Sequence, residues 1–167
     1  MNYSIILYVI GWVLNFEAAF MVPACVTGLI YREPETSALA AVALFCLAVG
    51  LLITKKKPRS MSLYAKEGFV TVALCWVVLS ALGALPFVIS RVIPSYVDAL
   101  FEVVSGFTTT GSSILPEVEH MPHCLLFWRS FTHWIGGMGV LVFVMAVLPL
   151  AGGTNMYMMK AESPGPS

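Results

Sequence analysis

Charged residues are scarce in this sequence of 167 residues, since Asp, Glu, Lys and Arg together make up 11% of it and the net charge is zero. Hydrophobic residues make up 59%, and the mean hydropathy is +0.87, far from the values of soluble domains. A chain without excess positive charge has no electrostatic attraction for nucleic acid. The composition therefore predicts a membrane protein and argues against a nucleic-acid partner.

The sequence also lacks the motifs of enzymes and of metal sites. It contains no Gly-x-Ser-x-Gly elbow, no phosphate-binding loop and no His-Glu-x-x-His. His120 and His123 are three residues apart, but no third ligand follows at a useful spacing, so we interpret them as surface-loop histidines. The cysteines stand singly, without metal or redox spacing, as small buried side chains do: Cys25, Cys46, Cys75 and Cys124. We expect neither an enzyme nor a bound cofactor.

Long apolar runs dominate what is present. They cover residues 3–30, 38–53, 69–89 and 125–150. At about 1.5 Å per residue, roughly 20 helical residues cross the hydrocarbon core of a bilayer. The sequence predicts an all-α membrane protein with four transmembrane helices. No Lys or Arg precedes Arg32, and the first run is too long for the core of a signal peptide, so we expect no cleaved signal.

Positive charge predicts the orientation of these helices. Five of the nine Lys and Arg residues lie in the one loop between the second and third runs. The positive-inside rule places this loop in the cytoplasm. Both termini are then cytoplasmic, and the loop over residues 32–35 faces outward. The basic residues of the cytoplasmic loop are Lys55, Lys56, Lys57, Arg59 and Lys66.

A polar run, Thr108, Thr109, Thr110 and Gly111, follows an apolar stretch over residues 95–106 that is too short to span. We interpret the apolar stretch as a re-entrant pore half-helix and the polar run as a filter loop. Irregular backbone is tolerated at membrane depth only where protein buries it or where it lines a watery cavity. Threonine and glycine backbones suit a cation filter made of carbonyl oxygens, and the negative end of the half-helix favours a cation. Taken alone, the run is equally compatible with a Ser/Thr-rich external loop, and the half-helix favours the pore.

Two charged residues near the run form a candidate pair. Glu102 lies on the predicted half-helix and Arg129 near the start of the last span, and we expect them to brace these elements against each other. The alternative is that Glu102 and Asp98, which share one helical face, concentrate cations at the mouth. Glu17, deep in the first span, has no assigned partner, although a lone charge there costs about 2.5–3.5 kcal/mol.

Glycines interrupt the last apolar run at Gly136, Gly137 and Gly139. Small residues let helices approach closely, and successive glycines also loosen a helix enough to bend it. We favour close packing over a gating hinge.

Several of these stretches together resemble the TrkH/KtrB family of potassium transporters. The resemblance is strongest to the TrkH branch, which carries two extra helices before its first pore repeat, and it covers nearly the whole chain. It rests on residues 68–69, 83–87, 101–111, 127–129, 134–139 and 161–166.

The resemblance implies potassium uptake across the bacterial inner membrane. Such proteins contain four helix–pore loop–helix repeats, each donating one filter strand, and they form homodimers gated by cytosolic nucleotide-binding regulatory subunits. In this chain, Thr108 to Gly111 would be the first filter strand, with the carbonyls of Thr109 and Thr110 coordinating K⁺. The implied parts are the extra helices with the basic loop (1–67), the first repeat (68–152) and a cytoplasmic connector (153–167).

The length departs from this pattern, because the chain holds two extra helices and one repeat where the family has four. We expect a truncated transporter subunit. One alternative is a homotetrameric cation channel, although the sequence lacks the Thr-Val-Gly-Tyr-Gly filter of ordinary tetrameric potassium channels. The other is a non-transporting membrane scaffold subunit.

Overall fold

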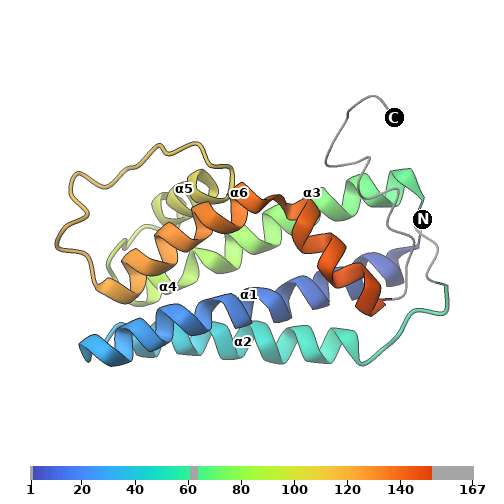
Figure 1. Ribbon diagram of the computed structural model, residues 1–167, viewed down its shortest axis with the longest axis horizontal. Helices are drawn as coiled ribbons and strands as arrows, with labels where there is room; N and C mark the ends of the chain where they lie inside the picture. The colour runs from blue at the N-terminus through green and yellow to red at the C-terminus, as the bar shows by residue number, and fades with distance from the viewer. Residues whose placement is uncertain (1, 61–63, 152–167) are drawn as a thin grey trace.

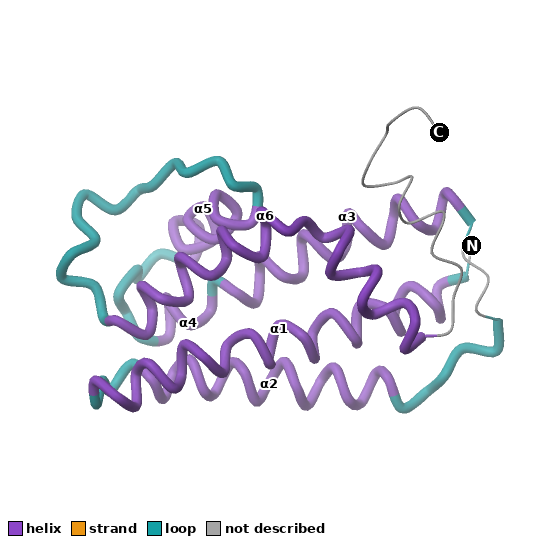
Figure 2. Tube along the Cα trace, viewed as in Figure 1, coloured by secondary structure: helices purple, strands orange, loops and turns teal. Residues whose placement is uncertain are grey.

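The chain folds into helices and connecting loops throughout the part that the computed structural model describes, residues 2–60 and 64–151, with residues 65 and 140–151 given as backbone. In chain order the elements are α1 (Tyr3–Tyr31), α2 (Thr36–Thr54), α3 (Ala65–Gly83), α4 (Leu85–Ile89), α5 (Tyr96–Phe107) and α6 (His123–Ala151). The all-α prediction is therefore confirmed for these residues (Figure 2).

Helix α1 is the central element and packs against α2, α6 and α3. Figure 1 shows α1 and α2 side by side as one layer, with α3, α5 and α6 above them. The largest side chains of the core are Trp128, Phe87 and Phe107, all fully buried. In a bilayer, close packing of such groups associates helices, because lipid tails are as apolar as the side chains.

The two ends of this bundle differ in character. The N-terminus and the basic loop between α2 and α3 lie at one end, where the backbone N–H of Asn2 donates to Glu67 Oε1 at 3.1 Å (Figure 1). The α1–α2 loop, α5 and the start of α6 lie at the other end. The predicted orientation needs the basic loop and the loop over residues 32–35 at opposite ends, as they are here; which end faces the cytoplasm stays a prediction.

Helix α1 runs without a break through Pro23. Its 29 residues make about 43 Å of helix, longer than a hydrocarbon core of about 30 Å. The hydroxyl of Thr27 donates to the Pro23 carbonyl at 2.9 Å and supplies a hydrogen bond beside the proline. The helix ends at Arg32, which is left-handed (φ 56°), and the next N–H, of Glu33, bonds back to the Gly28 carbonyl at 2.9 Å.

Three segments of the described chain are long and apolar enough to cross a membrane: Tyr3–Tyr31, Thr36–Thr54 and Lys66–Ile89. The last combines α3 and α4, which meet at Ala84. Pro86 has no N–H to continue the helical pattern, and the Gly83 carbonyl is satisfied by Trp128 Nε1 at 3.0 Å. The first three predicted spans thus correspond to candidate spans, the third as two helices.

The fourth predicted span, 125–150, falls on α6. This helix turns at Gly139, whose φ of 75° and ψ of 146° lie outside the helical range. The bend is visible where α6 changes from orange to red in Figure 1. Helix α6 is not one of the three candidate spans found among the described residues, so its crossing of the membrane remains a prediction.

Candidate functional site

Helix α5 is the short helix expected before the threonine run. The hydroxyl of Ser95 caps it by accepting a hydrogen bond from the Asp98 N–H at 3.4 Å. Its 12 residues make about 18 Å of helix, too short to span a bilayer. One face, with Ala99, Val103 and Phe107, is buried against its neighbours, and α5 packs on α6 and α3. The short helix predicted over 95–106 is present as α5, and its re-entrant character stays a prediction.

The run from Thr108 to Gly111, called the filter strand below, leaves α5 as a tight turn followed by exposed irregular backbone. Thr109 is left-handed (φ 55°), and Gly111 has a φ of 78° that glycine adopts without steric cost. The N–H groups of Thr109 and Thr110 donate back to α5, to Gly106 and Ser105, at 2.9 and 3.0 Å. Within the described chain, the carbonyls of Thr109 and Thr110 accept no hydrogen bond, so their oxygens are available to a ligand.

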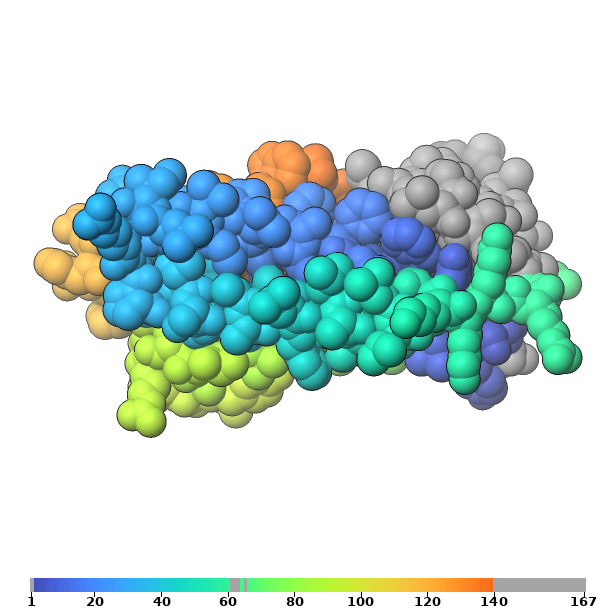
Figure 3. All heavy atoms as spheres, turned by 90° about the horizontal axis from the view of Figure 1, so that it is seen from below, coloured from blue at the N-terminus to red at the C-terminus, as the bar shows by residue number. Residues whose placement is uncertain are grey.

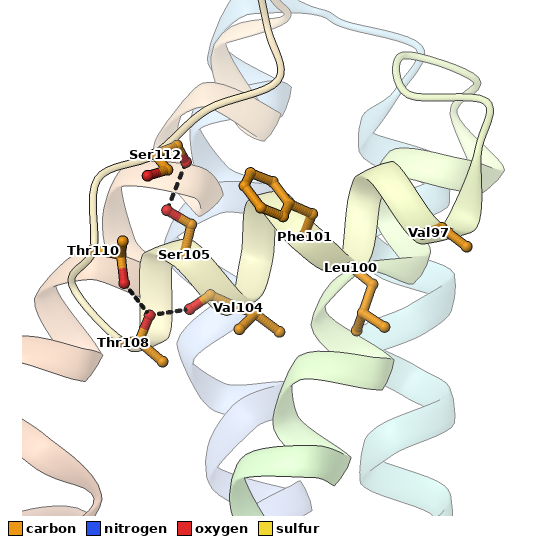
Figure 4. A pocket seen from close by; sticks show the side chains of 8 residues that line it. All are labelled: Val97, Leu100, Phe101, Val104, Ser105, Thr108, Thr110 and Ser112. Atoms are coloured by element: carbon orange, nitrogen blue, oxygen red, sulfur yellow. Dashed lines mark hydrogen bonds between the residues drawn. The ribbon is translucent and has the colours of Figure 1, made fainter.

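Hydroxyl groups hold this strand in place. Thr108 Oγ1 donates to the Val104 carbonyl at 2.7 Å and lies 2.7 Å from Thr110 Oγ1 (Figure 4). Because the one hydroxyl hydrogen of Thr108 goes to Val104, Thr110 must donate to Thr108. Ser105 Oγ donates to the Ser112 carbonyl at 2.6 Å. Both ends of the strand are therefore fastened to α5.

A groove of about 370 Å³ runs along α5 beside the strand. Figure 4 shows its wall, with apolar side chains along the helix and hydroxyl groups where the strand begins. Val97, Phe101 and Val104 on this face are exposed large hydrophobic residues. The strand thus begins beside an open groove on α5.

Glu102 joins the returning loop to both α5 and α6. Its carboxylate is 1% exposed and accepts hydrogen bonds from Arg129 Nε at 2.5 Å, from Ser113 Oγ at 3.0 Å and from the Ile114 N–H at 3.2 Å. The structure brings Glu102 and Arg129 together as the sequence predicted, with Ser113 and Ile114 as partners that the sequence did not indicate. Asp98, one turn away, is exposed.

The glycines of α6 differ in their surroundings. A Cβ built on Gly136 would lie 2.1 Å from the Phe107 carbonyl oxygen, whereas one on Gly137 would meet nothing within 4 Å. On the facing helix, a Cβ on Gly106 would lie 2.2 Å from Thr132 Oγ1. Gly136 and Gly106 allow close packing directly below the strand, and Gly139 marks the bend.

A contact that sequence reasoning missed connects the α1–α2 loop to the start of α6. The Glu33 carboxylate accepts hydrogen bonds from the backbone N–H of His123 at 2.6 Å and of Cys124 at 2.9 Å, and lies 2.8 Å from His123 Nδ1. Tyr31 stacks on the His123 ring, with centroids 3.9 Å apart. His123 is therefore the first residue of α6, not a loop histidine. Among the described residues, no group of three metal-ligating side chains occurs.

This contact predicts a pH dependence of stability. Burial acts to raise the pKa of Glu33, but hydrogen bonds from the Cys124 and His123 backbones outweigh it and lower the pKa from 4.5 to about 2. A folded-state pKa below the unfolded value means that the ionised carboxylate stabilises the fold above pH 4.5, and that this contribution is lost between pH 4.5 and 2. We expect Glu33→Gln to remove about 1–2 kcal/mol at neutral pH.

The measurement is unfolding in mixed detergent micelles at pH 7 and at pH 3. Glu35→Gln, the same chemical change in the same loop, serves as the control because the Glu35 side chain makes no capping hydrogen bond to α2. We expect the stability of Glu33→Gln to converge on that of the unmodified chain as the pH falls. An equal difference at both pH values would contradict the role assigned to the Glu33 carboxylate.

Comparison with known proteins shows which family the chain resembles. The sequence matches the TrkH family, described as cation transport proteins, over residues 35–167. It is 38% identical over 170 residues to the Trk system potassium uptake protein TrkH of Escherichia coli (strain K12), covering 99% of this chain and 35% of that protein. It is 34% identical over 165 residues to TrkG of the same organism, covering 97% of this chain and 34% of TrkG.

A solved structure agrees with these sequence matches. The crystal structure of the potassium transporter TrkH from Vibrio parahaemolyticus superposes with a TM-score of 0.80 at 30% identity, over 96% of this chain and 36% of that one. The chain spans about a third of the length of the curated relatives it matches. The chain belongs to the TrkH family of cation transport proteins.

Proposed function

We propose that this chain supplies one of four selectivity-filter strands of a potassium uptake protein of the bacterial inner membrane. The observation that carries the proposal is the exposed strand at the C-terminal end of α5, in which the carbonyls of Thr109 and Thr110 are free of hydrogen bonds within the described chain. Carbonyl oxygens replace the hydration shell of a cation in such filters. The relatives that bear the name potassium uptake protein support K⁺ as the ion.

The strand suits a cation for two further reasons. It lies at the C-terminal end of α5, where the helix dipole places negative partial charge. The buried carboxylate of Glu102 is neutralised by Arg129 and accepts a hydrogen bond from Ser113 of the returning loop. It therefore fixes the positions of α5, α6 and the loop around the strand. In this proposal Thr108 and Gly111 complete the strand, and Gly136, Gly137 and Gly139 let α6 pack beneath it and bend.

The wider assembly is part of the same proposal. Four strands surround one ion, so three further repeats must complete the pore. We propose residues 1–67 as two extra helices with a cytoplasmic basic loop, 68–152 as the first repeat with α6 crossing the membrane, and 153–167, which lie outside the described residues, as a connector. Both termini are cytoplasmic, and the complete protein is a homodimer regulated by a cytosolic nucleotide-binding subunit.

The test is rubidium uptake in bacteria that lack their own potassium uptake systems. A chimera in which this chain replaces the matching 170 residues of Escherichia coli TrkH is compared with its Gly111→Ser variant. A side chain at a φ of 78° strains the backbone by about 1–2 kcal/mol, which displaces the neighbouring carbonyls. We expect the chimera to transport and the variant to lose most of its uptake.

The control is Pro116→Ser, which introduces the same side chain at an exposed position of the loop that follows the strand. It should leave uptake unchanged. A membrane-inserted Gly111→Ser chimera that transports as well as this control would overturn the filter assignment. Expressing the 167-residue chain by itself in the same strain shows whether uptake needs the remaining repeats.

A further inference from the structure

A basic pocket lies at the end of the bundle opposite the α1–α2 loop. It is formed by the start of α1, the end of α2 and the loop after α2, and its volume is about 610 Å³. Lys56, Lys57 and Arg59 line one part of it, while Leu7 and Leu52 line another. The pocket therefore presents concentrated positive charge beside an apolar wall.

Hydrogen bonds across the pocket give it a defined rim. The side-chain amide of Asn2 donates to the Ser60 carbonyl at 3.1 Å, joining the residue before α1 to the loop after α2. The N–H of Asn2 donates to Glu67 at the start of α3. Three elements of the chain are thus tied together around the basic side chains.

Within the described residues, the positive charge of this pocket is not neutralised. Lys56, Lys57 and Arg59 are exposed, and no carboxylate in the described chain lies within ion-pair distance of them. Glu67 is the nearby acidic residue that the rim involves, and its oxygens accept from the Asn2 and Tyr64 N–H groups. An anion is therefore the ligand that complements this surface.

The apolar wall distinguishes a lipid from a free anion. Leu7 is 55% exposed and Leu52 is 64% exposed, so both lie on the outer faces of the α1–α2 layer. Figure 3 shows this face, with the side chains of the α2–α3 loop projecting beyond the helices at one end. A free phosphate would use only the basic groups, whereas a phospholipid would place its phosphate on them and its acyl chains along the two leucines.

We propose that this pocket binds the phosphate headgroup of an anionic phospholipid from the leaflet that the basic loop faces. Lys56, Lys57 and Arg59 hold the phosphate, and the exposed flanks of α1 and α2 contact the acyl chains. Basic pockets between transmembrane helices have the charge that such headgroups require. The site is independent of the filter strand and of any ion that passes it.

The test is native mass spectrometry of the full chain in detergent, titrated with phosphatidylglycerol or phosphatidylcholine. We compare Lys56→Gln/Lys57→Gln with Lys55→Gln/Lys66→Gln, which removes the same charge from the same end of the bundle at positions that do not line the pocket. Each lysine near an anionic headgroup contributes about 1 kcal/mol, or about fivefold in affinity. The pocket variant, which loses two lysines, should therefore bind phosphatidylglycerol about 25-fold more weakly. The control variant should bind almost as well as the unmodified chain.

Each other outcome overturns the proposal. Equal weakening in both variants would mean general attraction to the basic loop and no site. Equal affinity for phosphatidylcholine would remove the requirement for a negative headgroup. Full displacement of phosphatidylglycerol by millimolar inorganic phosphate would assign the pocket to a free anion. Circular dichroism of both variants, which change only exposed side chains, confirms that they are folded.

Discussion

Gly136→Ala is expected to destabilise the chain, whereas Gly137→Ala, one residue further along α6, is expected to be tolerated. The added Cβ at position 136 would lie 2.1 Å from the carbonyl oxygen of Phe107 and 2.9 Å from its Cα. These are backbone atoms at the end of α5, so no side-chain rotation relieves the clash. The two helices must move apart directly below the filter strand.

The size of the effect follows from opposing contributions. Alanine has the better helix propensity, by about 1 kcal/mol, and this gain applies to both variants. Overpacking of a close helix contact costs about 1–3 kcal/mol and sometimes more, and this cost applies only at Gly136. We therefore expect a net loss of stability for Gly136→Ala and none for Gly137→Ala.

The measurement is the fraction folded against SDS in mixed micelles, with both variants prepared in parallel. Similar midpoints for the two variants would show that α5 and α6 do not approach as closely as the structure has them. In the chimera with Escherichia coli TrkH, Gly136→Ala should also lower rubidium uptake, because Phe107 directly precedes the strand.

Much of this arrangement could be predicted because its signals are local in the sequence. A half-helix of 12 residues follows from Ser95 as a cap, an apolar face and the threonine run that ends it. The contact between Glu102 and Arg129 was predictable because a charge near membrane depth requires a partner and few candidates exist. Local patterns of this kind were sufficient to predict the filter strand, the helix before it and the ion pair beside it.

The rest depends on contacts between distant parts of the chain. Glu33 caps α6 across 90 residues of sequence, and no periodicity or motif connects the two. The one available hint was that α6 begins without a Ser, Thr, Asp or Asn of its own at the cap position. From the sequence, Gly136, Gly137 and Gly139 could not be distinguished from one another. The position of Phe107 in the structure shows that Gly136 lies in a close contact and that Gly137 does not.

Glu102→Gln is expected to cost about 3–5 kcal/mol, the largest effect of any conservative substitution in the site. The change keeps the shape of the side chain and removes its charge. It leaves the guanidinium of Arg129, 18% exposed, without its counter-charge. It also replaces one acceptor oxygen by an NH₂ group, which cannot accept from Ser113 or the Ile114 N–H, so the returning loop loses part of its attachment.

Asp98→Asn is the matched control, because it makes the same chemical change one turn earlier on an exposed side chain. We expect it to change stability by less than about 0.5 kcal/mol. A double-mutant cycle with Arg129→Gln then isolates the pair: the double variant should be more stable than the sum of the two single losses predicts, because no unpaired charge is left buried. Strict additivity would show that Glu102 and Arg129 act separately. In that case the carboxylate would serve the loop through Ser113 and the Ile114 N–H, and Ser113→Ala should reproduce part of the loss seen in Glu102→Gln.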